Sequence, residues 1–306
     1  MKNKKRILLI ARAVSKESKD KAGGFADRVQ NSIGESVEIE YCEISELFFE
    51  LSTRVINIYH PQKKFDLRDF DLVVIRHIGK MMANEAQAIV QYCEYFGIRY
   101  TDEYLNRLML DNKMSTQFLL WFNGIKNWPH TFYGNIDEMI RRFPEFGGKA
   151  IMKDNEGSKG RLNFLVESVA EVSDIQKQYP DKRFVLQEFI PNSGDLRVLV
   201  FNGKPVLVIE RKGVDGSHLN NTSQGGAAQI VPIESISSEV IDICVKAASV
   251  SRLQVAGVDV MFDSTNSKPY LLEVNNAPQV SSGAFQDEKV EKYSEMLLEM
   301  VGGDVR

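Results

Sequence analysis

A carboxylate and an amide stand two residues apart near the C-terminal end of the chain, in the run PYLLEVN at residues 269–275. The apolar residues before them predict a β-strand, and side chains at positions i and i+2 of a strand leave the same face. Glu273 and Asn275 are therefore expected to point together. Both carry oxygen donors of the kind that a hard divalent cation prefers. The spacing indicates a metal site.

A third oxygen donor, Asp259, lies upstream in the apolar run at residues 257–262. If the intervening loop is centred on Asn266, an antiparallel hairpin places Asp259 directly opposite Glu273. Taken alone, a strand that ends in Glu-x-Asn is more often only a solvated sheet face. The hairpin favours a Mg²⁺ site, because the opposite face would be apolar. That face would be formed by Val258, Val260, Leu272 and Val274.

The whole chain has the composition of an ordinary globular protein, with 306 residues, 43% hydrophobic and 26% charged. Its net charge of −4 argues against nonspecific nucleic-acid binding, which needs a basic surface. The apolar stretches are much shorter than the roughly 20 residues that span a bilayer. Cys42, Cys93 and Cys244 are widely spaced and odd in number, so they indicate neither a disulfide framework nor a zinc motif. We therefore expect a cytoplasmic protein without nucleic-acid or membrane partners.

The first hundred residues alternate between strands and helices. Strands are predicted at residues 6–11, 37–41, 71–76 and 97–101, with helices at residues 15–30 and 83–96. Such alternation is typical of parallel βαβ units. This part of the chain is therefore expected to be a small open α/β domain.

The order of elements changes in the rest of the chain. Helices are predicted at residues 105–122, 239–253 and 287–300, and short strands at residues 150–153 and 184–187. Residues 196–201 and 205–210 predict a hairpin around Asn202-Gly203, a strong turn signal. Both faces of this hairpin are largely apolar, so it is expected to be the central pair of an antiparallel sheet. A sheet of this kind that carries helices is an α+β arrangement.

Lys153 ends a predicted strand and precedes a loop with Gly157, Ser158 and Gly160. Small residues permit the backbone to approach an anion closely, and an ammonium group neutralises phosphate charge. A solvated turn is the ordinary alternative, and the spacing is not that of a P-loop. Lys113 is likewise an ordinary exposed lysine on local grounds.

Gln187, Glu188, Phe189 and Ile190 follow another predicted strand and lead into a loop that ends at Asp195. An extended segment of this kind could offer backbone groups and an apolar wall to a purine. Glu188 or Asp195 could accept hydrogen bonds from ribose hydroxyls. An edge strand followed by a turn is the alternative, and it is favoured locally.

Cationic side chains lie at the two ends of the hairpin sequence. Arg197 is near its start, and Arg211-Lys212 follows its end. Antiparallel pairing brings these ends to one end of the sheet, where arginines suit bidentate contact with an anion. A surface ion-pair cluster is the alternative. The polar segment at residues 220–227 adds amides, hydroxyls and glycines, a mixture more typical of a ligand loop than of a simple connection.

Taken in order, these elements resemble the ATP-grasp superfamily, and most closely its RimK-like and glutathione-synthase-like ligases, over residues 101–301. Five short motifs carry the resemblance, namely Asp195-Leu-Arg197, Glu210-Arg-Lys212, residues 221–226, Gly257-Val-Asp259 and Leu272-Glu-Val-Asn275. The resemblance implies a fold of α/β and α+β parts. An open α/β pre-ATP-grasp domain would occupy residues 1–100, a linker helix and a small lid residues 101–190, and an antiparallel-sheet domain with the metal site residues 191–306.

The resemblance also implies roles for the matching residues. Lys113 and Lys153 would contact the phosphates of ATP, and the loop with Gly157, Ser158 and Gly160 would close over them. The rest of the nucleotide would lie against Gln187, Glu188, Phe189, Ile190 and Asp195, with Lys212 also in the cofactor site. Catalytic contacts would come from Arg197, Arg211 and Asn221. Two Mg²⁺ ions, or Mn²⁺, would bind Asp259, Glu273 and Asn275.

The implied activity is ATP-dependent ligation of a carboxylate to an amine through an acyl phosphate, with an amino acid, a peptide or a protein terminus as acceptor. A dimer or tetramer is implied in the same way. A small-molecule kinase and a non-catalytic ATP-binding regulator are the alternatives. Two departures leave the substrate open. Leu219-Asn220-Asn221 stands where such ligases carry Arg-Ser-Asn, and Gln279-Val-Ser-Ser282 replaces their Pro-Gly continuation.

Overall fold

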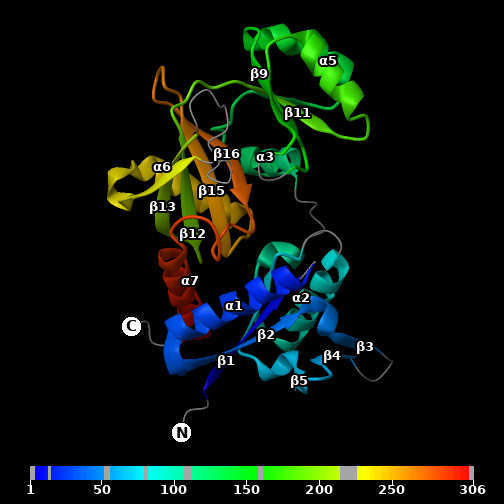
Figure 1. Cartoon of the computed structure of the whole chain (residues 1–306), viewed down its shortest axis with the longest axis vertical. Coiled ribbons are helices and arrows are strands. Elements are labelled where there is room, and N and C mark those ends of the chain that lie inside the picture. Colours follow the sequence, from blue (N-terminus) through cyan, green and yellow to red (C-terminus); the bar gives the residue numbers. More distant parts are fainter. Residues whose placement is uncertain are drawn as a thin grey trace.

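The computed structural model describes residues 4–12, 15–51, 56–78, 82–106, 112–157, 161–213 and 226–302, which form four sheets with flanking helices (Figure 1). The N-terminal sheet is parallel, in the order β2-β1-β6-β7. Its elements are β1 (Lys5–Ala11), α1 (Lys16–Ile33), β2 (Val37–Glu43), β6 (Leu72–Arg76), α2 (Ala83–Phe96) and β7 (Arg99–Thr101). The predicted open α/β architecture is confirmed.

Side chains of the two central strands, β1 and β6, alternate between two buried layers. Ile7 and Val74 face the layer that contains α1, whereas Leu8 and Val73 face α2. The first layer is completed by α7 (Gln286–Val301), which comes from the other end of the chain and lies beside α1. The N-terminal sheet is therefore packed directly against the C-terminal part of the molecule.

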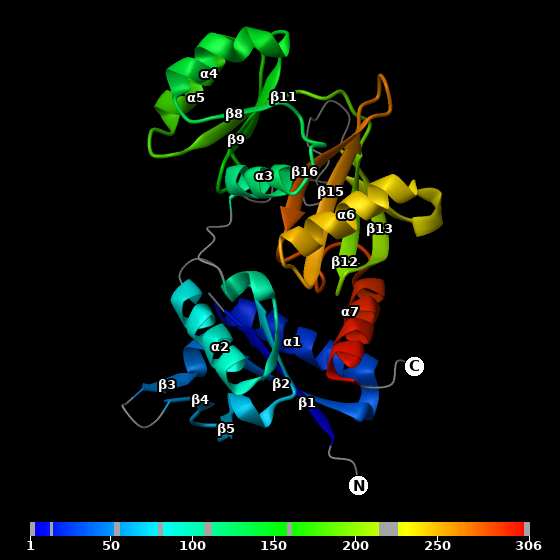
Figure 2. The same cartoon turned by 180° about the vertical axis from the view of Figure 1, so that it is seen from behind.

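A small antiparallel sheet in the order β3-β4-β5 projects from the N-terminal part (Figure 2). Its strands are β3 (Phe48–Leu51), β4 (Ile56–His60) and β5 (Phe65–Asp66). These strands were not predicted, because they are short and their apolar residues are not cleanly alternating. Phe48 at the edge is 51% exposed.

The lid is an antiparallel sheet in the order β10-β9-β11-β8 that stands apart from the N-terminal sheet (Figures 1 and 2). Its elements are β8 (Thr131–Tyr133), α4 (Ile136–Arg142), β9 (Ala150–Asp154), β10 (Asn163–Val166), α5 (Val169–Gln178) and β11 (Phe184–Glu188). Met152 and Leu186 pack in a core with residues of α4 and α5. Because strand side chains alternate, Lys153 and Gln187 leave the opposite face, away from these helices.

The C-terminal sheet is antiparallel in the order β14-β13-β12-β15-β16. Its strands are β12 (Asp195–Phe201), β13 (Lys204–Lys212), β14 (Ala227–Val231), β15 (Val255–Phe262) and β16 (Pro269–Asn275). The predicted hairpin forms β12 and β13 and lies inside the sheet. One face packs on α6 (Ser238–Val250) through an apolar core. Helix α7 covers only part of the other face, against Leu199, Phe201 and Val255.

Of the helix predicted at residues 105–122, residues 105 and 106 end a short 3-10 helix (Glu103–Asn106), and residues 107–111 lie outside the described residues. Helix α3 spans Lys113–Phe122, with Asn112 as its N-cap. The Asn112 backbone is extended, and its side chain accepts a hydrogen bond from the Ser115 N–H at 2.9 Å. None of the helices in the described part of the chain is long and apolar enough to cross a membrane.

Asp102 joins the N-terminal sheet to the C-terminal one. The residue is 4% exposed, and its carboxylate accepts hydrogen bonds from the N–H groups of Gln254 and Val255, at 2.9 and 3.1 Å. Burial raises the pKa of Asp102 from 3.8 to about 7, although Arg76 and the two N–H groups oppose the rise. The acid is therefore more readily neutral in the folded protein than in the unfolded chain.

Asp102→Asn tests this buried acid. Because the pKa of Asp102 is higher in the folded state, the folded protein binds more protons than the unfolded chain between pH 3.8 and about 7. Stability should fall as pH rises through this window. Asparagine keeps an acceptor for both N–H groups and carries no charge. Thermal unfolding of the variant should depend less on pH, and at about pH 8 its midpoint should be higher by about 2 °C or more. Parallel curves for both proteins would contradict this.

Candidate active site

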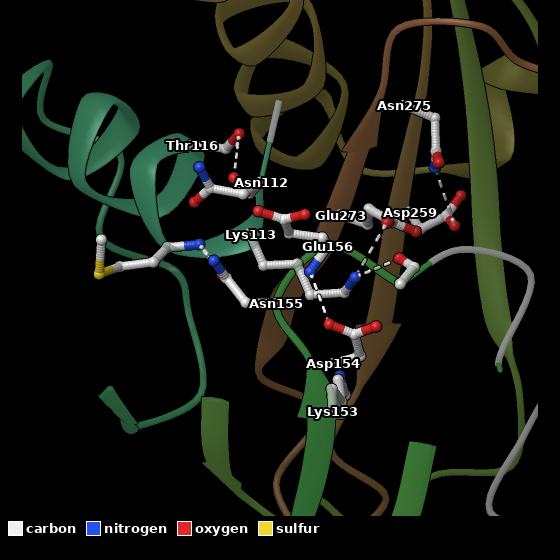
Figure 3. Close-up of polar contacts among 12 residues, drawn as sticks. Asn112, Lys113, Thr116, Lys153, Asp154, Asn155, Glu156, Asp259, Glu273 and Asn275 are labelled. Atoms are coloured by element: carbon white, nitrogen blue, oxygen red, sulfur yellow. Dashed lines mark hydrogen bonds and ion pairs between the residues drawn. The ribbon is translucent and has the colours of Figure 1, made fainter. Parts of the chain in front are cut away.

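The hairpin of β15 and β16 places the three predicted metal donors together. Asp259 pairs with Glu273 and Gly257 pairs with Asn275, as the sequence predicted for the first pair. The Asn275 side-chain amide lies 3.5 Å from Asp259 Oδ2 and donates to the Gly257 carbonyl at 3.3 Å (Figure 3). Two carboxylates and an amide therefore share one face of the sheet.

A β-bulge corrects one detail of the predicted hairpin. The register shifts between Asp259 and Val260, so Val260 pairs with Leu271 and Leu272 is left as the extra residue. Leu271, rather than Leu272, joins the apolar core under α6. The prediction that Leu272 lies on that face was wrong. The N–H of Leu271 bonds to the carbonyl of Asn127 at 2.7 Å instead of a strand partner.

Asp259 is held by two arginines from neighbouring strands. Arg197 donates from Nε and Nη2 to its two oxygens at 2.8 and 2.7 Å, and Arg211 Nη2 lies 3.1 Å from Oδ2. Arg211 also donates to Asp195 at 2.6 Å. Burial alone would raise the pKa of Asp259, but Arg197 and Arg211 overcome it and lower that pKa. Burial and the charge of Asp259 raise the pKa of Asp195 to about 6.

Arg211→Met should show how much the ion pairs of Arg211 with Asp195 and Asp259 contribute to the free energy of unfolding. Arg211 is 5% exposed, and its loss would leave Asp195 and Asp259 with one arginine between them. Removing one partner from a buried ion pair costs about 3–5 kcal/mol. Urea unfolding at about pH 7 should show a loss of this size, and a smaller loss at about pH 5, where Asp195 can take up a proton.

Lys212→Met is the matched control. The Lys212 side chain is 55% exposed and lies 3.5 Å from Glu210, so it belongs to a surface pair. Its replacement should change the unfolding free energy by no more than about 0.5 kcal/mol. Equal losses of unfolding free energy in the two variants would show that the buried ion pairs of Arg211 contribute no more to stability than the surface pair of Lys212.

Glu273 differs from Asp259 in having no close ion pair among the described residues. Its side chain is 39% exposed, and Lys113 Nζ lies 4.0 Å from it. Burial among its neighbours raises the pKa of Glu273, with Lys113 opposing the rise and Asp259 adding to it. A divalent cation would stabilise such a carboxylate, so the donor set fits a metal ion. Within the described ranges no three His, Cys, Asp or Glu side chains gather, so the third donor would be the Asn275 amide.

Two lysines from different elements interact with the charge of Glu273, and Figure 3 shows Lys113 beside it. Lys113 begins α3, and its Nζ donates to the Gly157 carbonyl at 2.6 Å. Lys153 lies in β9 and donates to Gln187 Oε1 at 2.8 Å. Burial lowers the pKa of Lys153 to about 8, Glu273 opposes this effect, and Lys113 adds to it. The two ammonium groups and one carboxylate leave an excess of positive charge, which suits a polyanion.

An apolar wall lies at one end of the sheet face that carries Asp259, Glu273 and Asn275. Ile190, Met261 and Tyr270 form a buried cluster, and Leu272 packs against it. The sequence pointed to Ile190 only, because the bulge that turns Leu272 to this side cannot be read from residue patterns. Near the same end, Glu188 accepts from the His130 N–H at 3.2 Å, and Lys149 Nζ lies 4.6 Å from the Phe189 ring centroid.

The loop at residues 276–283 lies at the other end of the face. Two cations hold it from outside the sheet. Lys289 of α7 donates to the carbonyls of Gln279 and Ser282, both at 2.6 Å, and Arg76 of β6 donates to that of Pro278 at 3.2 Å. Lys289 is 4% exposed. Sequence reasoning missed it, although a lysine four residues before the buried Tyr293 falls on the apolar stripe of its helix.

Three predicted site residues, Ser158, Gly160 and Asn221, lie outside the described residues. Gly157 ends the described turn after β9. A Cβ there would lie 2.9 Å from the Asp154 Cβ and 3.1 Å from the Arg161 carbonyl oxygen, so this position requires glycine.

Comparison with known proteins assigns the class. Residues 111–298 match the RimK-like ATP-grasp domain family, and the chain belongs to that family. It is 30% identical over 249 residues to a probable alpha-L-glutamate ligase of Desulfotalea psychrophila, covering 79% of this chain but only 52% of that protein. The chain therefore spans about half the length of that relative. It is 26% identical to a probable alpha-L-glutamate ligase of Cellvibrio japonicus, with 79% of each chain covered.

Solved structures show the same fold. D-alanyl-alanine synthetase A from Vibrio cholerae superposes with a TM-score of 0.68 at 17% identity, covering 99% of this chain and 98% of that one. The ATP-grasp ligase PsnB, complexed with a minimal precursor, Mg and ADP, gives a TM-score of 0.64 at 15% identity, covering 96% and 97%. The ATP-grasp fold predicted from the sequence is confirmed. The protein is an enzyme of the ATP-grasp ligase class.

Proposed function

We propose that this protein joins a carboxylate to an amine through an acyl phosphate, with ATP converted to ADP and phosphate. The observation that carries the proposal is the strand register, which pairs Asp259 with Glu273. Lys113 and Lys153 both interact with the charge of Glu273. Carboxylate is a poor electrophile, and phosphorylation gives it a leaving group before the amine arrives. The family supports ATP and a divalent cation as cofactors.

The order of side chains along β15 indicates how the substrates would be oriented. Met261, Asp259 and Gly257 follow one another on one face at steps of about 6.7 Å. The purine would lie against the apolar wall at Met261, and the phosphates at Asp259 and Glu273. The carboxylate substrate would then lie beyond the phosphates, towards Gly257 and the 276–283 loop. Pro278 supports this loop by packing on Gly257, where a Cβ would be only 2.9 Å away.

The chain's own residues would act by binding and by electrostatics. Lys113 and Lys153 would hold the phosphates, and Mg²⁺ held by Asp259, Glu273 and Asn275 would neutralise their charge during transfer. Arg197 is 18% exposed at its side chain and is kept in place by Asp259, so it would contact the transferring or acyl group. Arg211 is more deeply buried and would hold Asp259. No histidine base is required, since catalysis of this kind rests on positioning and charge.

The amine substrate is proposed to be an amino acid or the terminus of a peptide or protein. The names of the two relatives make L-glutamate the first amine to test. An amino-acid and peptide panel, with products identified by mass spectrometry, would define the pair. The 276–283 loop is the part of the described chain where we expect the choice to be made.

ADP release should depend on the amine. A ligase releases ADP fully only when carboxylate and amine are both present, because the acyl phosphate is otherwise retained. ADP release that ignores the amine, together with a stable phosphorylated product, would instead indicate a kinase. ATP binding without any ADP release across the panel would indicate a regulator.

Glu273→Ala should abolish ADP formation in Mg²⁺ while the protein remains folded. The loss should be at least about 100-fold, the scale of a lost electrostatic contact to a transition state. Glu210→Gln, which removes a partly exposed carboxylate from β13 of the same sheet, should keep turnover within about twofold of the parent. Circular dichroism would verify the fold of both variants. Near wild-type turnover for Glu273→Ala would refute the metal assignment.

A further inference from the structure

The two lysines that interact with the charge of Glu273 belong to different parts of the molecule. Lys153 lies in the lid sheet, whereas Lys113 opens α3, whose Leu120 packs in the core under α6. Figures 1 and 2 both show α3 between the lid and the C-terminal sheet. Since like charges repel, the separation of these ammonium groups must be set by other contacts.

Asn155 supplies those contacts. Its carbonyl accepts from the N–H of Lys113 at 3.0 Å, and its side-chain Oδ1 accepts from the N–H of Met114 at 3.0 Å. Its own N–H donates to the carbonyl of Arg183 at 2.8 Å, just before β11. Asn155 is 4% exposed. One buried residue, two positions after Lys153, therefore fastens the first turn of α3 to the lid (Figure 3).

The start of α3 has two distinct caps. The first N–H groups of a helix have no partner within the helix. Asn155 satisfies those of Lys113 and Met114, whereas Asn112 satisfies that of Ser115. Asn112 directly precedes Lys113, so its cap bond to the Ser115 N–H runs within the helix segment. Only the Asn155 cap also fixes where the helix lies relative to β9.

The turn that carries Asn155 is itself rigidly held. Asp154 is 5% exposed, and its carboxylate accepts from the Glu156 N–H at 3.1 Å and pairs with Lys182 at 3.0 Å. The Gly157 N–H donates back to the Asp154 carbonyl at 3.1 Å, and the Gly157 carbonyl accepts from Lys113 Nζ. The backbone and the ammonium group of Lys113 are thus both bound to the same short turn.

We propose that Asn155 is a positioning residue for the phosphate site: it fastens α3 to the end of β9 and so sets the separation of the Lys113 and Lys153 ammonium groups. This inference rests on the proposed function, because it requires the two lysines to bind the phosphates of ATP. Asn155 itself contacts neither the nucleotide nor the reacting groups. Its loss should weaken the binding of phosphates and leave the binding of the nucleoside part unchanged.

The test compares Asn155→Ala with the matched cap variant Asn112→Ala. Dissociation constants would be measured with Mg²⁺ present for AMPPNP by calorimetry, and for adenosine, which has no phosphate, by competition. Asn155→Ala should weaken AMPPNP binding by about tenfold or more, with adenosine binding changed by less than about twofold. Asn112→Ala removes one helix cap as well and should lower the unfolding midpoint similarly, yet keep both constants within about twofold.

Asn155→Asp keeps an acceptor for the Met114 N–H but adds a negative charge near the phosphates, so it should restore the unfolding midpoint and only part of the AMPPNP affinity. Asn155→Ser is the substitute if the alanine variant does not fold. Equal weakening of AMPPNP and adenosine by Asn155→Ala, or AMPPNP binding within about twofold of the parent, would overturn the inference. Lys153→Met distinguishes a failure of this inference from a failure of the proposed function. If Lys153→Met loses AMPPNP and Asn155→Ala does not, only this inference fails; if the parent protein binds no AMPPNP, the proposed function fails too.

Discussion

The pairing of β15 with β16 is the constraint on which the rest of the site depends. Because side chains alternate along a strand, a shift of one residue would send Asp259 and Glu273 to opposite faces. The bulge at Leu272 keeps both carboxylates together while it moves an apolar side chain to the end of that face where Ile190 and Met261 lie. The Leu271–Asn127 hydrogen bond stabilises the bulge from outside the hairpin.

Charge compensation divides this face into two unequal parts. The charge of Asp259 is compensated by Arg197 and Arg211, which hold its side chain in place. Among the described residues, Glu273 has Lys113 at 4.0 Å as its ion-pair partner, and its pKa is raised. The ion pairs of Asp259 fix the positions of the proposed donors. A divalent cation would stabilise the Glu273 carboxylate, and phosphate would stabilise the lysines near it. This division follows the general observation that perturbed acids gather at functional sites.

Much of this arrangement could be predicted from the sequence, because it depends on local rules. The period of a strand and an assumed loop centre at Asn266 predicted the Asp259–Glu273 pair correctly. The structure reaches this pair by another route, because the register next to the loop pairs Phe262 with Pro269, and the bulge then brings Asp259 opposite Glu273. The Asn202-Gly203 turn and its apolar flanks were enough to place β12 and β13 in the middle of a sheet.

Other features depend on contacts between distant segments and have no local signal. The bulge depends on Asn127, and the 276–283 loop depends on Arg76 and Lys289 from two other elements. The role of Asn155 appears only when α3 is seen against the lid. Sequence patterns predicted the metal donors and the cofactor contacts, but the groups that hold these side chains in place became visible only in three dimensions.

The central claim is that a substrate carboxylate attacks ATP to form an acyl phosphate. Its most direct test uses the carboxylic acid that supports amine-dependent ADP release, labelled with ¹⁸O in its carboxylate. Attack of the amine on an acyl phosphate leaves one carboxylate oxygen on the departing phosphate. The released phosphate should carry ¹⁸O, detected by mass spectrometry or by the isotope shift of its ³¹P resonance. Unlabelled phosphate, formed together with the amide product, would contradict it.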